Sequence, residues 1–553
     1  MSMISESKIS SSSSNRKQLP KQQSITTTDN SKDNDNDNDN DNDNSVTFHF
    51  IVSSECSSYQ LWETLAHFHS AEAVHQCGRF TWIISGCLPD DQLHLGKGKG
   101  GAKSDVLTAK VMQQHVDQHF PPHHQDTDTL VTNCSRLVPE IHFTPDFSNM
   151  TVYGGPYADG KTPRYFRNRK TGKQVRSSYG NTYVFNNKPN GLLHWAQAHQ
   201  HDNGNDNEAI VLIDPDFLFL SHFHLIRPDL SVVGQKQQQR QQLRDRDLVH
   251  PGQPAAASYG LGAQWLEFDL SKICGTDSPC VNTTQDQVHQ YYSAGPPYVI
   301  HRSDVLQLAQ TWVSLVPATY DEYPLLYAEM YAYSVAAAHL QLRHNLINNI
   351  FTGCMVGWPN PNRWGNSNKD QQHQETVALP QSATSYRIQL AEELKEAKEI
   401  QRSNIGGTRF PQSLRQEDEQ GPTSCFLPGL SPPPFLHYCN RYMIKATTDE
   451  MKQAAVDNNK NKSNNDSVIT YYFFAKRKVD HANVFSCDNN TTTTTTTTTS
   501  HRFLPFPSIK EKEEMANGNE DWNTLAVCAI VRTLNFARNR GCHRRRYNQE
   551  EEH

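Results

Sequence analysis

The most constraining feature of the sequence is an apolar run at residues 209–213, Ala-Ile-Val-Leu-Ile, which contains no polar side chain. A strand that is apolar on both faces is typical of a parallel sheet covered by helices on both sides. Residues 46–52 and 80–85 are predicted as two more strands, with a helical segment at 59–70 between them. This order predicts an α/β fold that opens with a β-loop-α-β unit of a doubly wound, mostly parallel sheet.

The later segments predict further helices and one more strand. Residues 189–199 have helical spacing, and residues 297–300 are predicted as a strand. Ser303 or Asp304 is expected to cap a helix that follows this strand and runs to about Leu315. We therefore expect strands and helices to continue alternating, as in a Rossmann-like sheet flanked by helices.

The composition indicates that part of the length does not fold. Hydrophobic residues make up 36% of the chain and the mean hydropathy is −0.73. Asp-Asn repeats at 33–44 and a threonine tract at 491–499 cannot bury enough apolar surface to offset their ordering entropy. Four parts are expected: a disordered low-complexity tail at 1–45, a folded domain at 46–360, a continuation with inserted loops at 361–478, and a low-complexity, largely disordered tail at 479–553.

The charge balance excludes some classes of partner. The chain has 52 Lys and Arg against 59 Asp and Glu, so nucleic acid is not expected as a partner. The basic stretch at 164–176 is predicted to be a solvated hairpin or an acceptor-peptide contact. Residues 1–20 lack the apolar core of a signal peptide. No run of about 18 apolar residues predicts a membrane span.

The 12 cysteines include no Cys-x-x-Cys pair, so a structural zinc site is not expected. Cys274 and Cys280 are separated by a Gly- and Pro-containing segment that favours a turn. They are predicted either to form a disulfide or to remain two free thiols.

An Asp-x-Asp triplet, Asp214-Pro-Asp216, comes directly after the apolar strand. Two carboxylates at the carboxyl end of a buried strand need compensation for their charge. Mn²⁺ or Mg²⁺ takes oxygen ligands and can bridge to a diphosphate, so the context favours a metal site. The alternative is a turn in which one aspartate caps the next segment.

A series of motifs follows one order along residues 46–357, with weaker matches beyond. They are Ser-Ser-Glu-Cys at 53–56, Asn-Lys-Pro at 187–189, Ile-Asp-Pro-Asp at 213–216, Gly-Pro-Pro-Tyr at 295–298, Leu-Tyr-Ala-Glu at 326–329 and Leu-His-Tyr at 436–438. In this order they resemble the motifs of plant and algal peptidyl serine α-galactosyltransferases and hydroxyproline O-arabinosyltransferases.

The resemblance implies a GT-A fold, a UDP-sugar donor and a divalent metal. It implies transfer, with retention at the anomeric carbon, of galactose or arabinofuranose to Ser or hydroxyproline of acceptor proteins rich in these residues. Asp214 and Asp216 would hold the metal, with His437 as the third ligand. The family also implies membrane attachment and a Golgi or ER lumen location, although this chain shows no segment that would provide the attachment.

Further residues are candidates for binding the donor. Ser53 and Glu55 lie in a polar segment, 53–58, which is predicted to be a loop at the carboxyl end of the first strand. Lys188 at a helix start could bind the diphosphate, or it could be a surface lysine. Two glycines allow the backbone to approach a sugar or phosphate, unless they only form a turn; they are Gly260 and Gly262.

Glu329 is expected inside one long helix at 323–342 that is apolar nearly all round. An ionised glutamate there is unfavourable unless it is paired or solvated by a cleft. It could orient the acceptor hydroxyl or stabilise positive charge on the sugar, or it could bond loop amides as a structural carboxylate. Asp321 and Glu322 are expected at the start of the same helix, where they would complement its dipole.

Two other functions remain alternatives. A relative that has lost catalysis would bind a sugar or peptide only. A nucleotidyltransferase would also use acidic metal ligands, but it usually has a Gly- and Lys-rich loop after the first strand, which residues 53–58 lack.

Overall fold

The computed structural model describes parts of the chain, some of them by backbone alone. The described residues are 47–90, 106–121, 137–150, 165–167, 174–176, 182–200, 207–225, 231–232, 249–348, 350–353, 433–438, 441–445, 471–476, 484–485, 526, 529–530, 532–534, 536–538 and 540. The chain divides into units 1–44 and 45–553, and every described residue belongs to the second. The predicted tail at 1–45 and the threonine tract lie outside the described residues.

An eight-stranded sheet in the order β3-β2-β1-β6-β10-β9-β11-β8 forms the centre of the fold. Its strands are β1 (Thr47–Glu55), β2 (Arg79–Ser85), β3 (Glu140–Thr144), β6 (Glu208–Ile213), β8 (Ser231–Val232), β9 (Ala255–Ser258), β10 (Ala294–His301) and β11 (Asn345–Asn348). β1 pairs in parallel with β2 and β6, and β2 pairs in parallel with β3. β10 is antiparallel to both of its neighbours, so β9 runs in the same direction as β6. The predicted α/β class with a mostly parallel sheet is confirmed.

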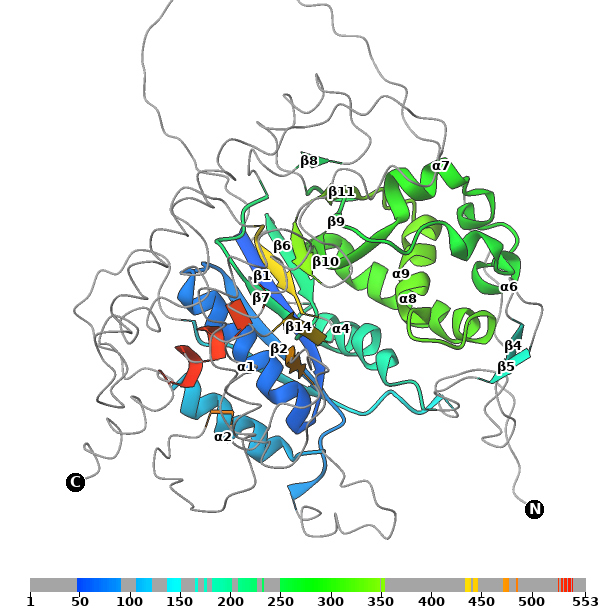
Figure 1. Cartoon of the computed structure of the whole chain (residues 1–553). Helices are drawn as coiled ribbons and strands as arrows, with labels where there is room; N and C mark the ends of the chain where they lie inside the picture. The colour runs from blue at the N-terminus through cyan, green and yellow to red at the C-terminus, as the bar shows by residue number, and fades with distance from the viewer. Residues whose placement is uncertain are drawn as a thin grey trace, which may run out of the picture. The chain divides into compact units, whose positions relative to one another are not determined.

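Helices cover both faces of this sheet. They are α1 (Ser58–Ala73), α2 (Ala109–His119), α4 (Asn187–Ala198), α6 (Leu270–Cys274), α7 (Gln285–Gln287), α8 (Arg302–Glu322) and α9 (Ala328–His339). Phe50 and Val52 of β1 pack in a core with α1 and α2, whereas Ile51 packs in a second core with α4, α8 and α9. Figure 1 shows α1 and α2 in blue on one side of the strands and α8 and α9 in green on the other. Burial of both faces explains why β6 is apolar throughout.

Smaller sheets complete the described part. A three-stranded sheet consists of β12 (Phe351–Gly353), β13 (Phe435–His437) and β7 (Phe217–Phe219), in this order. Two antiparallel pairs are β14 (Arg441–Lys445) with β15 (Tyr471–Ala475), and β4 (Tyr165–Arg167) with β5 (Gln174–Arg176). The β4–β5 pair lies in the basic stretch, for which a hairpin was one of the two expectations.

Two local predictions were wrong. The segment predicted to be a loop from residue 53 is strand as far as Glu55, because the backbone of Ser53–Glu55 pairs with that of Ile83–Ser85 in β2. The start of the helix predicted at 323–342 is also wrong, since α8 runs as far as Glu322 and α9 begins only at Ala328. Pro324 disfavours helical geometry at the preceding residue, whose φ is −140°. Asp321 and Glu322 therefore end a helix, and the predicted role at a helix start is wrong.

Two disulfides tie described segments together. Cys274 is bonded to Cys280, which is the disulfide alternative for this pair. Cys56 is bonded to Cys87, joining the ends of β1 and β2. The sequence did not indicate the second bond, because its cysteines are 31 positions apart and meet only when the strands pair.

Helical positions within 526–540 are buried against the core around Phe50, including Ala529 and Leu534. Composition had predicted a largely disordered tail here, but the apolar residues of this stretch give it a face to bury. Among the helices of the described ranges, none is long and apolar enough to cross a membrane.

Candidate functional site

Asp214 and Asp216 lie directly after β6, at the edge of the sheet where the parallel strands end. The amide of Phe217 donates to the carbonyl of Asp214 at 3.3 Å, closing a turn that leads into β7. Both carboxylates are only partly exposed, at 23% for Asp214 and 16% for Asp216. Each therefore needs a charged partner close by.

Lys188 is the partner of Asp214. It lies in the first turn of α4, and its Nζ is 2.7 Å from Asp214 Oδ1 and 3.0 Å from Glu329 Oε1. Burial alone would lower the pKa of Lys188, but the charges of Asp214 and Glu329 outweigh it and raise this pKa above its usual value. One ammonium group thus joins three elements of the fold.

Glu329 belongs to the first turn of α9 and is buried. Its backbone is fixed by two hydrogen bonds, from its own amide to the hydroxyl of Tyr183 at 2.9 Å and from the indole of Trp312 to its carbonyl at 2.7 Å. Burial raises the pKa of the Glu329 carboxyl to about 7, although Lys188 opposes the rise. Oε2 of Glu329 is buried and has no hydrogen-bond partner among the described residues. The carboxyl is therefore held in place with one oxygen available.

Asp216 has two different partners. The first is His437 on β13, whose Nε2 lies 3.4 Å from Asp216 Oδ2. Pairing of β13 with β7 brings it there, and the amide of Tyr438 also donates to the carbonyl of Asp216 at 3.0 Å. Lys476 Nζ lies 2.7 Å from the same carboxylate oxygen. Burial alone would raise the pKa of Asp216, but the charges of Lys476 and His437 hold it far below its usual value.

Lys476 also contacts Glu63 of α1, with 3.3 Å between Nζ and Oε1. Burial raises the pKa of Glu63 to about 7, against the influence of Lys476. Sequence reasoning missed both residues as site members. Glu63 lies among buried residues on a helix, and only the weak motif matches beyond residue 357 extended as far as Lys476.

Four other predicted residues lie at the same edge of the sheet without a direct contact to the aspartates. Val52 pairs with Ile213, which places Ser53 at the level of Asp214 on the adjacent strand. Burial, with the charge of Asp146, raises the pKa of Glu55 to about 7. Gly260 and Gly262 follow the end of β9, and nothing lies within 4 Å of where their Cβ atoms would be.

Gly262 has a φ of +60°, which favours glycine in this turn. Tyr259, just before the turn, has its pKa raised by burial and by the charges of Asp214 and Asp216. Gly295 makes room for the ring of Tyr259, since a Cβ on Gly295 would lie 2.4 Å from its Cγ. The close approach of β10 thus positions an aromatic side chain beside the two aspartates.

The donor set of two carboxylates and one imidazole has the chemistry that Mn²⁺ or Mg²⁺ accepts. Oδ2 of Asp216 and Nε2 of His437 already converge, while Asp214 faces Lys188. Within the described ranges, no three His, Cys, Asp or Glu side chains are already grouped to hold a metal ion. The residues fit a metal provided that Asp214 turns from Lys188 and a cation replaces Lys476 on Asp216.

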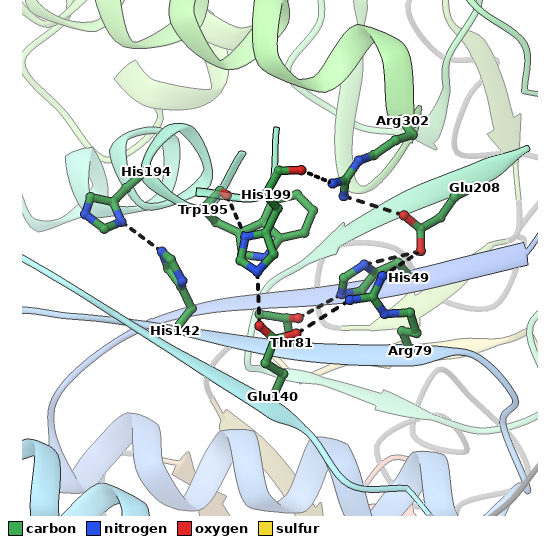
Figure 2. Close-up of polar contacts among 10 residues, drawn as sticks. All are labelled: His49, Arg79, Thr81, Glu140, His142, His194, Trp195, His199, Glu208 and Arg302. Carbon is green, nitrogen blue, oxygen red and sulfur yellow. Dashed lines mark hydrogen bonds and ion pairs between the residues drawn. The ribbon is translucent and has the colours of Figure 1, made fainter. Parts of the chain in front are cut away.

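A second polar cluster lies at the opposite edge of the sheet, where the parallel strands begin (Figure 2). Glu208 is its centre, with nitrogens of His49, Arg79 and Arg302 each 3.5 Å from its carboxylate. Burial alone would raise the pKa of Glu208, but His49 and the two arginines lower it. His142 Nε2 and His194 Nδ1 lie 2.8 Å apart in the same cluster. Sequence spacing did not indicate this group, which is assembled from several strands and helices.

No family model and no curated protein matches the chain. Among solved structures, mouse xyloside xylosyltransferase 1 in its apo form is similar over 58% of this chain and 91% of that chain. The sequence identity is 8% and the TM-score is 0.26.

Proposed function

We propose that the chain is a GT-A-like, metal-dependent, retaining glycosyltransferase that moves a sugar from a UDP-sugar to Ser or hydroxyproline hydroxyls of proteins. One observation carries the proposal. Of the two aspartates after β6, Asp214 pairs with Lys188 at 2.7 Å and Asp216 contacts His437 at 3.4 Å. Lys188 in turn pairs with Glu329 at 3.0 Å, so side chains from three other elements converge on this edge of the sheet. In open α/β sheets, ligands bind at the carboxyl ends of the strands, where this group lies.

Asp214, Asp216 and His437 would hold the divalent cation. Such a cation supplies stabilisation of the negative charge that develops on a departing nucleoside diphosphate. Lys188 would add a second positive charge beside it once Asp214 turns away. Ser53 and Glu55, at the end of the neighbouring strand, would contact the nucleotide.

Glu329 would act on the sugar or the acceptor. Its carboxyl, with a pKa of about 7, can accept or share a proton near neutral pH. When ionised it would stabilise positive charge on the sugar ring, and it would orient the attacking hydroxyl on the same face. Nothing lies within 4 Å of where the Cβ atoms of Gly260 and Gly262 would be, so the sugar would lie against the backbone of this turn.

The two disulfides support an oxidising compartment. A Golgi or ER lumen location would bring the protein together with secreted acceptor chains rich in Ser and hydroxyproline.

The test is to incubate the full chain with Mn²⁺, a panel of UDP-sugars, and Ser and hydroxyproline peptides, and to weigh the products. We expect one sugar to be transferred, and Asp214→Ala and Asp216→Ala to abolish transfer. Glu140→Ala is the matched control, because this carboxylate is half-exposed at the opposite edge of the sheet.

Each other outcome has a defined meaning. Binding of a UDP-sugar without any product would identify a non-catalytic sugar-binding relative. Attachment of UMP to the acceptor with release of a sugar 1-phosphate would indicate nucleotidyl transfer. Full transfer by both aspartate variants would refute the proposed site.

A further inference from the structure

Asp216 is paired with a positively charged side chain of the protein itself. The ammonium of Lys476 is 2.7 Å from Asp216 Oδ2, and only 10% of the lysine side chain is exposed. His437 Nε2 approaches the same oxygen at 3.4 Å. The position that a divalent ion shared by Asp216 and His437 would take is therefore already next to a positive charge.

Lys476 has other partners that do not depend on Asp216. Its Nζ is 3.3 Å from Glu63 Oε1, and it lies 5.9 Å from the ring centroid of Tyr59 and 5.8 Å from that of Tyr438. A carboxylate and two aromatic faces can stabilise an ammonium group. Lys476 can thus leave Asp216 without becoming a buried, unpaired charge.

We propose that Lys476 occupies the cation position on Asp216 when no divalent ion is bound, and that it competes with the ion for this carboxylate. Binding of the ion moves the Lys476 ammonium onto Glu63. The inference rests on the proposed metal site, since it assigns to that site a built-in competitor. It makes Lys476 a positioning residue that sets metal affinity.

The charges favour such an exchange. Two ammonium groups, of Lys188 and Lys476, face four carboxylates, of Asp214, Asp216, Glu329 and Glu63. With all of these ionised, the group has a formal charge of −2, which a divalent ion would neutralise. The lysines hold the carboxylates together in the absence of the ion but neutralise only half of their charge.

The experiment measures Mn²⁺ binding to the full chain by calorimetry, without donor or acceptor. Lys476→Met removes the competing charge, and we expect it to bind Mn²⁺ at least about tenfold more tightly than the unmodified protein. Lys476→Arg keeps a cation and should stay within about threefold. Asp216→Asn should abolish binding. Lys476→Gln is a second neutral variant in case Lys476→Met does not fold, and circular dichroism checks the folding of each variant.

Salt separates direct competition from a remote charge effect. Exposed charges are screened within about 10 Å at 0.1 M salt and about 3 Å at 1 M. The gain in affinity of Lys476→Met should persist at high salt if the ammonium occupies the carboxylate itself. A gain that disappears at high salt would overturn the inference.

Two further results would overturn it. If Lys476→Met binds Mn²⁺ no better than the unmodified protein while Asp216→Asn loses binding, the metal site stands and the competition does not exist. If no variant binds Mn²⁺ and the unmodified protein does not either, the proposed metal site and the competition both fail.

Discussion

Replacing Glu329 by glutamine is expected to stabilise the protein in a pH-dependent way. Glutamine keeps an oxygen for the Lys188 ammonium but cannot ionise. Burial raises the pKa of Glu329 from 4.5 to about 7 in the folded protein. Since one pKa unit corresponds to about 1.36 kcal/mol, ionisation of this carboxyl lowers the free energy of unfolding by about 3 kcal/mol.

The direction of this pH dependence follows from proton binding. The folded protein holds the Glu329 proton more tightly than the unfolded chain, so its contribution to stability is fully present below pH 4.5 and is lost as pH rises to about 7. Glu329→Gln should therefore match the unmodified protein below about pH 4.5 and exceed it by about 3 kcal/mol above pH 8. Denaturant unfolding of both proteins at several pH values from about 4 to about 9 measures this difference.

Glu140→Gln is the matched control, because this carboxylate is 45% exposed and lies at the opposite edge of the sheet. Glu140 contacts His199 at 3.1 Å and Arg79 at 3.6 Å, and exposed ion pairs contribute about 0–1 kcal/mol, so its effect should stay within about 1 kcal/mol throughout. A difference between Glu329→Gln and the unmodified protein that does not change with pH would refute the reasoning, as would a less stable variant at pH 8. A gain in stability together with a loss of sugar transfer is the behaviour of a carboxylate kept for function.

Two more changes test the framework around the site. Gly295→Ala would place a Cβ 2.4 Å from Cγ of Tyr259, so it should lower the free energy of unfolding by about 1–3 kcal/mol in a denaturant titration. Gly260→Ala is the control, because nothing lies within 4 Å of the added Cβ and the φ of Gly260, like that of Gly295, is not positive. An unchanged unfolding midpoint for Gly295→Ala would show that the ring moves freely. The double variant Cys56→Ala/Cys87→Ala opens a loop with a sequence separation of 31, and it should lose about 3–4 kcal/mol in the same titration. A loss below about 1 kcal/mol would mean that strand pairing alone holds these segments.

The elements that sequence could predict are those determined by their own side chains. The strand at 209–213 was recognised because it is apolar on both faces, and the helices on both sides of the sheet follow from that. The break between α8 and α9 was expected after about Leu315, but it follows Glu322, because helical spacing alone does not define where a helix ends although Pro324 marks the position. Ser53 and Glu55 were placed in a loop because pairing with β2 is not visible in the sequence of β1.

The candidate site, too, could be predicted from the sequence only in part. Asp214 and Asp216 could be found because they follow a recognisable strand. Glu63 could not, since nothing in α1 marks which buried position will meet a lysine from the other end of the chain. The cluster around Glu208 was missed for a similar reason, because its members are brought together only by the order of strands in the sheet.

The distance along the chain between Asp216 and Lys476 has a consequence for synthesis. The two residues are 260 positions apart, and His437 also comes from this late segment. At about 5–20 residues per second, β6 and its aspartates emerge roughly 10–50 s before Lys476. During that interval the sheet can form while Asp216 has neither of its positive partners. A ribosome that stops before residue 435 would therefore release a chain whose sheet can be complete but whose candidate site carries excess negative charge.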